Sequence, residues 1–96
     1  MQERDKILNL YDIYKDLLTT NEQNYFKLYY FKDLTFNEIS EECSVSKSYV
    51  SKVIKNVVNK LNNYEDKINM YKIKEELKNI IKDTKDNRIT KLYEKL

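Results

Sequence analysis

The sequence predicts an all-α protein, and three observations support this fold class. The 96 residues include no glycine and no proline, so the chain lacks the residues that usually form the tight turns and bulges of β-rich folds. Apolar residues recur at intervals of three and four along most of the chain, which is the spacing of amphipathic helices. The segment 35–61 has the pattern of a helix-turn-helix.

The length of the chain allows only one modest hydrophobic core. We therefore expect a single domain over residues 1–96. Its core is predicted at 5–71, and a C-terminal helical extension is predicted at 72–96.

Helix start signals flank a short turn in the segment 35–61. Thr35 and Glu38 have the spacing of a capping box, which marks the start of a short helix. Residues 43–45 are too few for anything but a turn, and the Ser46 hydroxyl can cap the helix that follows. Apolar residues then recur on one face of this second helix, at Val50, Val53, Ile54, Val57, Val58 and Leu61.

The other face of the second helix is basic. Residues 46–64 carry four lysines and no acid, hence a charge of +4, whereas residues 35–45 carry three glutamates, hence −3. The whole chain has a net charge of only +2, so we expect any contact with nucleic acid to be a local patch. A solvated surface is the simpler interpretation of a lysine-rich face, but its place on the second helix of a helix-turn-helix favours contact with double-stranded DNA. The predicted nucleic-acid-binding residues are Lys47, Ser48, Tyr49, Ser51, Lys52, Lys55, Asn56 and Lys60.

Two further helices are expected before the helix-turn-helix. Residues 5–18 have the pattern of an amphipathic helix. A capping box then starts a second helix at about 21–32, formed by Thr19 with Glu22 or by Thr20 with Gln23. The aromatic residues 25–31 crowd this helix. We expect them to pack in the core, and stacking on RNA bases is the weaker alternative.

The C-terminal part continues the apolar pattern beyond Leu61. One long helix and two helices bent near Asn63 both fit the residues there. The next break is expected at 83–87, followed by a short helix at 88–96. The apolar stripe is longer than the first helix can cover, so a homodimer or a protein partner is expected to cover the rest.

The composition argues against an enzyme. The chain has no histidine for acid–base catalysis and no glycine-rich loop for phosphate. It has no His/Cys cluster for a metal either, so we predict no catalytic residue, no cofactor and no metal site. Cys43 is the single cysteine, which excludes an intrachain disulfide and suggests a cytoplasmic setting. No apolar run approaches the length of a membrane span, so we expect no membrane insertion.

Two family resemblances meet in these residues. Spaced positions between Leu18 and Val50, among them Leu34-Thr35, Glu38-Ile39-Ser40 and Val45-Ser46, resemble the DNA-binding fourth region of bacterial sigma factors. That region is a helix-turn-helix of the winged-helix-like DNA-binding class, without a wing. The chain is more closely similar to the YlxM family of small bacterial helix-turn-helix proteins. The segments that carry this likeness include Asn9–Tyr14, Leu17–Thr19, Leu28–Tyr30 and Tyr64–Tyr71.

The resemblances imply two functions. The first is a DNA-binding regulator of transcription that uses the helix at 46–61. The second is an accessory protein of the signal recognition particle pathway, which binds its GTPase or its RNA. A third, weaker hypothesis is a polymerase-binding module without DNA contact. The sequence departs from the family pattern at Ser44, where Asn or Gly is typical, and at Tyr49, where a small residue is usual.

Overall fold

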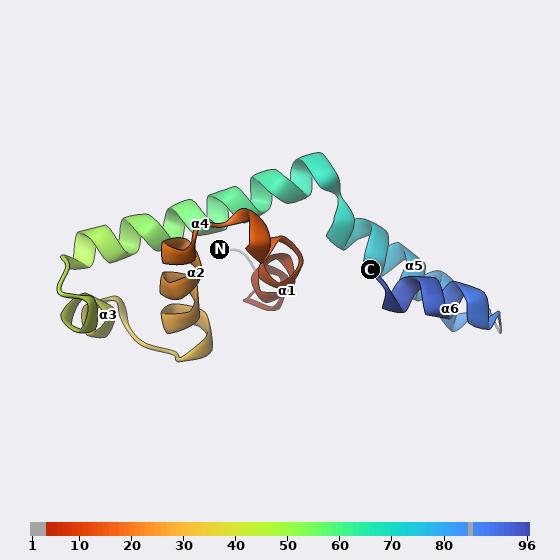
Figure 1. Cartoon of the computed structure of the whole chain (residues 1–96), viewed down its shortest axis with the longest axis horizontal. Coiled ribbons are helices and arrows are strands. Elements are labelled where there is room, and N and C mark those ends of the chain that lie inside the picture. The colour runs from red at the N-terminus through yellow and green to blue at the C-terminus, as the bar shows by residue number, and fades with distance from the viewer. Residues whose placement is uncertain (1–3, 85) are drawn as a thin grey trace.

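The computed structural model describes residues 4–84 and 86–96, which contain six α-helices and no β-strand. The helices are α1 (Arg4–Tyr14), α2 (Thr20–Phe26), α3 (Phe36–Cys43), α4 (Lys47–Ile68), α5 (Met70–Lys82) and α6 (Asn87–Glu94). The long helix α4 has α1, α2 and α3 packed along one side of it, and α5 and α6 lie beyond its far end (Figure 1). The prediction of an all-α fold is confirmed.

The second helix begins where a capping box was expected. Of the two alternatives, the structure has Thr19 with Glu22: the Glu22 N–H donates to Thr19 Oγ1 at 3.1 Å, and the Thr19 N–H donates to Glu22 Oε1 at 2.9 Å. A 3₁₀ turn at Lys15–Leu17 precedes the box, and α2 continues into a π-helical turn at Lys27–Phe31. Together α2 and this turn match the helix predicted at about 21–32.

The core divides into two clusters that share α4. At one end of α4, Val57 and Leu61 pack against α1 and α2, where the Tyr11 and Phe26 rings stack with their centroids 4.0 Å apart. At the other end, Val50 and Ile54 pack against Tyr25 of α2 and against α3. Core packing is thus confirmed for Tyr25 and Phe26, whereas Phe31 at the end of the aromatic run is 55% exposed.

The short helix α3 starts where it was predicted, and the turn after it lies at residues 44–46, one residue later than predicted, because Cys43 still belongs to α3. The Glu38 N–H donates to Thr35 Oγ1 at 3.1 Å and the Thr35 N–H donates to Glu38 Oε1 at 3.0 Å, which completes the expected capping box. Ile39 of α3 is fully buried against Val50, and Val45 of the turn packs in the same cluster.

The three-residue corner depends on a left-handed serine. Ser44 has φ 55° and ψ 46°, and this conformation ends α3. The Val45 N–H donates to the Ser40 carbonyl at 3.0 Å and the Ser44 N–H donates to the Glu41 carbonyl at 3.4 Å, which is the Schellman motif that usually has glycine at the left-handed position. A β-carbon in this conformation costs about 1–2 kcal/mol.

Neither alternative expected for the residues after Leu61 is fully correct, because the helix breaks, but it does so six residues after Asn63. α4 runs through Asn63 without interruption and ends at Ile68, where Asn69 is left-handed at φ 58°. The next break lies between Lys82 and Asn87, where it was predicted. Among the described residues, none of the helices combines the length and the hydrophobicity that a membrane crossing requires.

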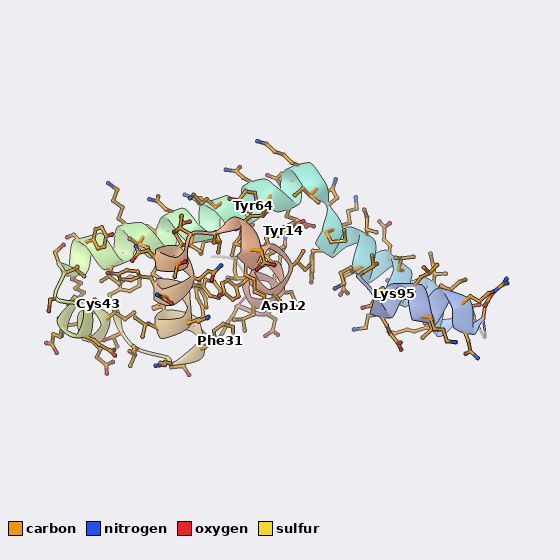
Figure 2. All side chains as sticks on the ribbon, in the orientation of Figure 1. Asp12, Tyr14, Phe31, Cys43, Tyr64 and Lys95 are labelled. Carbon is orange, nitrogen blue, oxygen red and sulfur yellow. The ribbon has the colours of Figure 1, made fainter. Side chains whose placement is uncertain are left out.

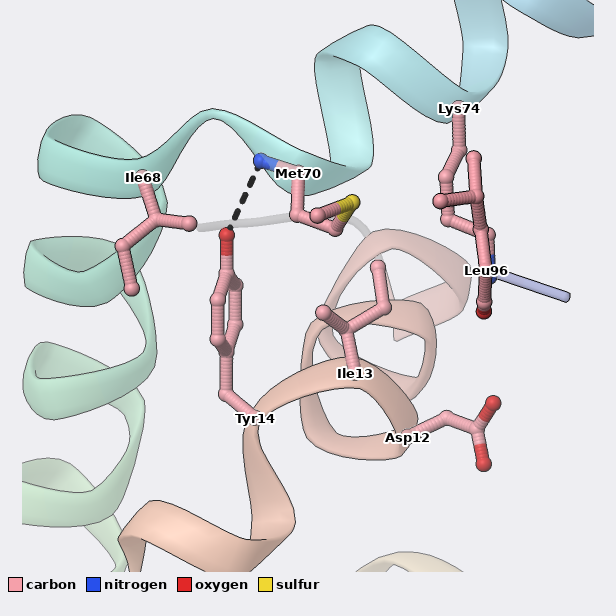
Figure 3. Close-up of a pocket in the computed structure, with 7 residues that line it drawn as sticks. All are labelled: Asp12, Ile13, Tyr14, Ile68, Met70, Lys74 and Leu96. Atoms are coloured by element: carbon pink, nitrogen blue, oxygen red, sulfur yellow. Dashed lines mark hydrogen bonds between the residues drawn. The ribbon is translucent and has the colours of Figure 1, made fainter. Parts of the chain in front are cut away.

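The corner between α4 and α5 is fixed by Tyr14 and Glu65. The Tyr14 hydroxyl donates to Glu65 Oε1 at 2.7 Å and accepts from the Met70 N–H at 3.1 Å, as Figure 3 shows for the second bond. The Glu65 carboxylate also accepts from the Tyr71 and Lys72 amides, at 3.0 and 3.1 Å. These bonds cap the first turn of α5, for which Asn69 supplies no side-chain cap. Burial, and then the bond to Glu65, raises the pKa of Tyr14 to about 12.

Replacing Ser44 by glycine should stabilise the fold. Ser44→Gly relieves the left-handed strain, and after the larger chain entropy of glycine we expect a gain of about 0.5–1 kcal/mol in the free energy of unfolding, measured in urea. Ser51→Gly, the same change inside α4, should instead cost about 0.5 kcal/mol. Equal effects of the two substitutions would contradict the assigned role of the corner.

Removing the Tyr14 hydroxyl should weaken the corner between α4 and α5. Tyr14→Phe leaves the Met70 amide and part of the Glu65 carboxylate without a partner, so we expect a loss of roughly 1–3 kcal/mol in unfolding free energy. Tyr64→Phe is the matched control, because its hydroxyl donates to the Leu17 carbonyl at an exposed site. A loss of only roughly 0.5 kcal/mol is expected there.

The Tyr14 hydroxyl should also make the free energy of unfolding depend on pH in the alkaline range. The pKa of Tyr14 in the fold lies above the ordinary value of 10, so its contribution is complete below pH 10 and is lost as the pH rises through about 12. The unfolding free energy of the native chain should therefore fall more steeply over this interval than that of Tyr14→Phe. Parallel pH profiles from denaturant titrations would refute this assignment.

Candidate nucleic-acid interface

The second helix of the helix-turn-helix begins at a serine cap. The Tyr49 N–H donates to Ser46 Oγ at 3.1 Å, as expected from the sequence. Every fourth or third residue that follows is buried, and α3 lies against the first half of this buried face. The opposite face of α4 is therefore left to solvent.

The exposed face of α4 borders a shallow groove of about 640 Å³, which we call the lysine groove. It runs along the first three turns of α4, and Phe36 at the start of α3 forms part of its wall. Six of the eight predicted nucleic-acid-binding residues line it. The lining residues are Phe36, Lys47, Ser48, Ser51, Lys52, Lys55, Asn56 and Asn59.

The lysines of the groove carry unneutralised charge. Within residues 4–84 and 86–96, Lys47, Lys52 and Lys55 have no ion pair, and all three are exposed. Because the chain supplies no counter-charge, an anion that entered the groove would not have to displace a carboxylate. Serine hydroxyls and asparagine amides between the lysines add hydrogen-bonding groups of the kind that contact phosphates and base edges.

The acidic residues of α3 lie outside this groove. None of Glu38, Glu41 and Glu42 is among its lining residues. Glu38 is engaged in the capping box, and the hydrogen bonds from Thr35 hold the pKa of its carboxyl below the usual 4.5. Glu41 accepts a hydrogen bond from Asn37 Nδ2 at 3.3 Å. The separation of acidic and basic residues expected from the sequence is therefore present in the structure.

Lys60 differs from the other predicted lysines, because its charge is paired. Its Nζ lies 2.7 Å from Glu22 Oε2, and the Glu22 side chain is only 12% exposed. Burial by itself would raise the pKa of Glu22, but the hydrogen bonds from Lys60 and Thr19 outweigh it and lower this pKa. Lys60 thus links α4 to the start of α2 through this ion pair. It is not among the residues that line the lysine groove.

Tyr49 is the second predicted residue outside the groove. Its ring meets that of Tyr25 edge-on, with the centroids 5.9 Å apart. The Tyr49 ring thus covers part of Tyr25, a residue of the second core cluster.

Two residues of the groove were not predicted. Asn59 lies four residues after Lys55, so helical spacing could have found it. Phe36 is half-buried against the second core cluster, with its ring 4.9 Å from that of Tyr29. The Phe36 side chain also lines the groove. Because Phe36 belongs to α3, the spacing of residues along α4 could not predict this.

Comparison with known proteins agrees with this architecture. A family model described as "Putative helix-turn-helix protein, YlxM / p13 like" matches residues 1–96. A UPF0122 protein of Ureaplasma urealyticum is 48% identical over 65 residues, which cover 68% of this chain and 66% of that protein. A UPF0122 protein of Clostridium kluyveri is 42% identical over 85 residues, or 88% of this chain and 74% of the relative.

A third relative, from Desulforamulus reducens, is 38% identical over 82 residues, covering 84% of this chain and 70% of its own length. The segment matched in the Ureaplasma protein spans slightly less than two thirds of that relative. The resemblance to the YlxM family is confirmed. The chain belongs to the UPF0122 family of YlxM / p13-like helix-turn-helix proteins.

Proposed function

We propose that this chain binds double-stranded DNA by placing the first turns of α4 in a major groove, and that it acts as a bacterial regulator of transcription in the cytoplasm. The observation that carries the proposal is the lysine groove: three exposed lysines without ion-pair partners among the described residues, on the second helix of a helix-turn-helix. The second helix of this motif is the one that enters the major groove in known complexes.

The positions of the groove residues along α4 suit two kinds of DNA contact, one to base edges and one to phosphates. Lys47, Ser48 and Ser51 lie in its first turns, where such a helix meets base edges. Lys55 and Asn56 follow one turn later and are suited to phosphate contacts. Lys60 is assigned to the fold, because Glu22 already neutralises it.

A single copy of the chain is expected to bind DNA with low affinity. Even if all three groove lysines neutralised phosphates, the slope of log K against log salt would be only about −2.7, far smaller than that of tightly bound repressors. Specific recognition would then require two copies with their recognition helices about 34 Å apart.

The alternative function, an accessory protein of the signal recognition particle, is supported by the family resemblance and by no particular contact in the structure. It would use the same fold to bind a GTPase or an RNA. Under this alternative, neither the native chain nor a variant with substitutions in the lysine groove should bind duplex DNA.

Charge reversal in the groove tests the proposal. Lys47→Glu/Lys52→Glu should weaken binding to duplex DNA roughly 10- to 100-fold in gel shift or fluorescence anisotropy, because two positive charges that face the DNA become negative. The salt slope should fall to about −1, since one groove lysine remains.

The matched control is Lys27→Glu/Lys32→Glu. It changes the net charge of the chain by the same amount, at two exposed lysines outside the groove. Its binding should stay close to that of the native chain apart from a small long-range effect. If both double variants lose affinity equally, or if the groove variant loses none, the lysine groove is not the interface.

A further inference from the structure

The last two helices form an arm that has no core of its own. We define the arm as residues 70–96, which comprise α5, α6 and their connection. No described residue in α5 or α6 is buried, although both helices carry an apolar stripe. Helices of 13 and 8 residues are marginal in water unless tertiary packing covers their apolar face.

Exposed apolar side chains concentrate on the arm. Of the eight large apolar side chains that are exposed in the described part of the chain, five lie at Ile68 or beyond. Ile73 and Ile80 of α5 are 43% and 56% exposed, and Leu92 and Leu96 are 64% and 49% exposed. Such clustering marks an interaction surface, whereas single exposed apolar residues do not.

The arm stands away from the body of the molecule. The structure measures 53 × 25 × 24 Å, and its radius of gyration of 16.4 Å exceeds the roughly 12.5 Å of a compact domain of this length. Figure 1 shows α5 and α6 side by side beyond the end of α4, and Figure 2 places Lys95 on the arm, away from the Tyr14 and Tyr64 side chains of the body. The body covers only the root of the arm, where Met70 and Tyr71 at the start of α5 pack against the first core cluster.

The apolar surface continues from the arm to the body through a hollow of about 320 Å³ (Figure 3). Ile13 of α1, Ile68 at the end of α4, and Met70 and Leu96 of the arm supply its apolar lining. Asp12 and Lys74, which have opposite charges, lie on the same lining.

Ile73 and Ile80 lie seven residues apart on α5, so they share one face of this helix. Leu92 lies on α6, and Leu96 follows four residues later, just after the end of α6. The surface to be covered consists of these apolar side chains on the two helices and the hollow at the root of the arm.

We propose that a second copy of this chain covers the surface, with the two arms packed face to face across a two-fold axis as a four-helix arrangement. The inference goes beyond DNA binding and does not depend on it. In a two-fold contact the same surface meets itself, so it must complement itself in shape and in charge.

The charges of the arm meet this requirement. Its described residues include seven bases and five acids, Lys72, Lys74, Lys78, Lys82, Arg88, Lys91 and Lys95 with Glu75, Glu76, Asp83, Asp86 and Glu94. Among them only Arg88 and Asp86 form an ion pair within the described structure. A strongly acidic or basic partner would meet like charges here, whereas a second copy can set each base against an acid.

The available area fits a reversible dimer. α5 is about 20 Å long and a pair of helices is about 20 Å wide, so each copy offers about 400 Å² in projection and the two copies about 800 Å². The hollow adds to this area and brings the contact near the lower limit of roughly 1,000–1,200 Å² for specific interfaces. We therefore expect a dissociation constant in the range of roughly 1–100 μM.

Sedimentation velocity of the full chain without DNA tests this inference. The native chain should shift from monomer to dimer between about 1 and 500 μM. Ile80→Glu should raise the dissociation constant at least about tenfold, since it places a charge in the apolar face. Leu92→Lys should have the same effect, and because it adds the opposite charge, agreement between the two shows that burial and not net charge is responsible.

Leu17→Glu is the matched control. Leu17 is 54% exposed, close to the value for Ile80, but it lies on the body in the turn before α2. This variant should dimerise like the native chain, and circular dichroism should show native helix content for every variant. A native chain that stays monomeric at about 500 μM, or a Leu17→Glu variant that dissociates as much as Ile80→Glu, would overturn the proposal. The DNA-binding proposal would be unaffected, because no DNA is present in the measurement.

Discussion

The fold depends on one buried stripe of α4. Val50, Ile54, Val57 and Leu61 are each no more than 4% exposed, and α1, α2 and α3 all pack against them. Full burial of such side chains contributes about 1.5–3 kcal/mol each, so together they match the whole net stability of a typical domain, about 5–15 kcal/mol. Since the stripe turns one face of α4 inward, the lysines on the other face must point outward. The orientation of the candidate interface is thus a consequence of the core.

A chain without glycine has to form its corners with other residues. Among the described residues, positive φ angles occur at Asp33, Ser44 and Asn69, and each lies just after the end of a helix or helical turn. Asp and Asn tolerate the left-handed conformation better than Ser, because their short polar side chains can hydrogen-bond locally. The corner of the helix-turn-helix therefore has the least suitable residue of the three, and the two hydrogen bonds of the Schellman motif help to offset its strain.

Lysines serve two purposes on the same helix. Lys60 lies beside a carboxylate that is mostly buried and is held in place by a capping box, so its charge belongs to the packing of α4 on α2. Lys47, Lys52 and Lys55 face solvent with no acid bound to them in the described structure. A negatively charged partner can therefore form new ion pairs with Lys47, Lys52 and Lys55, whereas Lys60 is already paired with Glu22. The arm adds a third kind of surface, in which both signs of charge surround exposed isoleucines and leucines.

The sequence alone determined the helical class, the capping box at Thr35, the serine cap at Ser46, the presence of a short corner between α3 and α4, and the break near residue 83, because caps and apolar spacing are local properties of the chain. It also placed six residues of the lysine groove correctly on one helix face. Only the tertiary structure decided that Lys60 is paired with Glu22 and that Phe36 reaches the groove, because both facts join residues from different helices. It likewise decided that Asn69, and not Asn63, ends α4, since the cap of the next helix comes from Tyr14, more than fifty residues away in the chain. Spacing along one helix carries no information about a hydroxyl supplied by another.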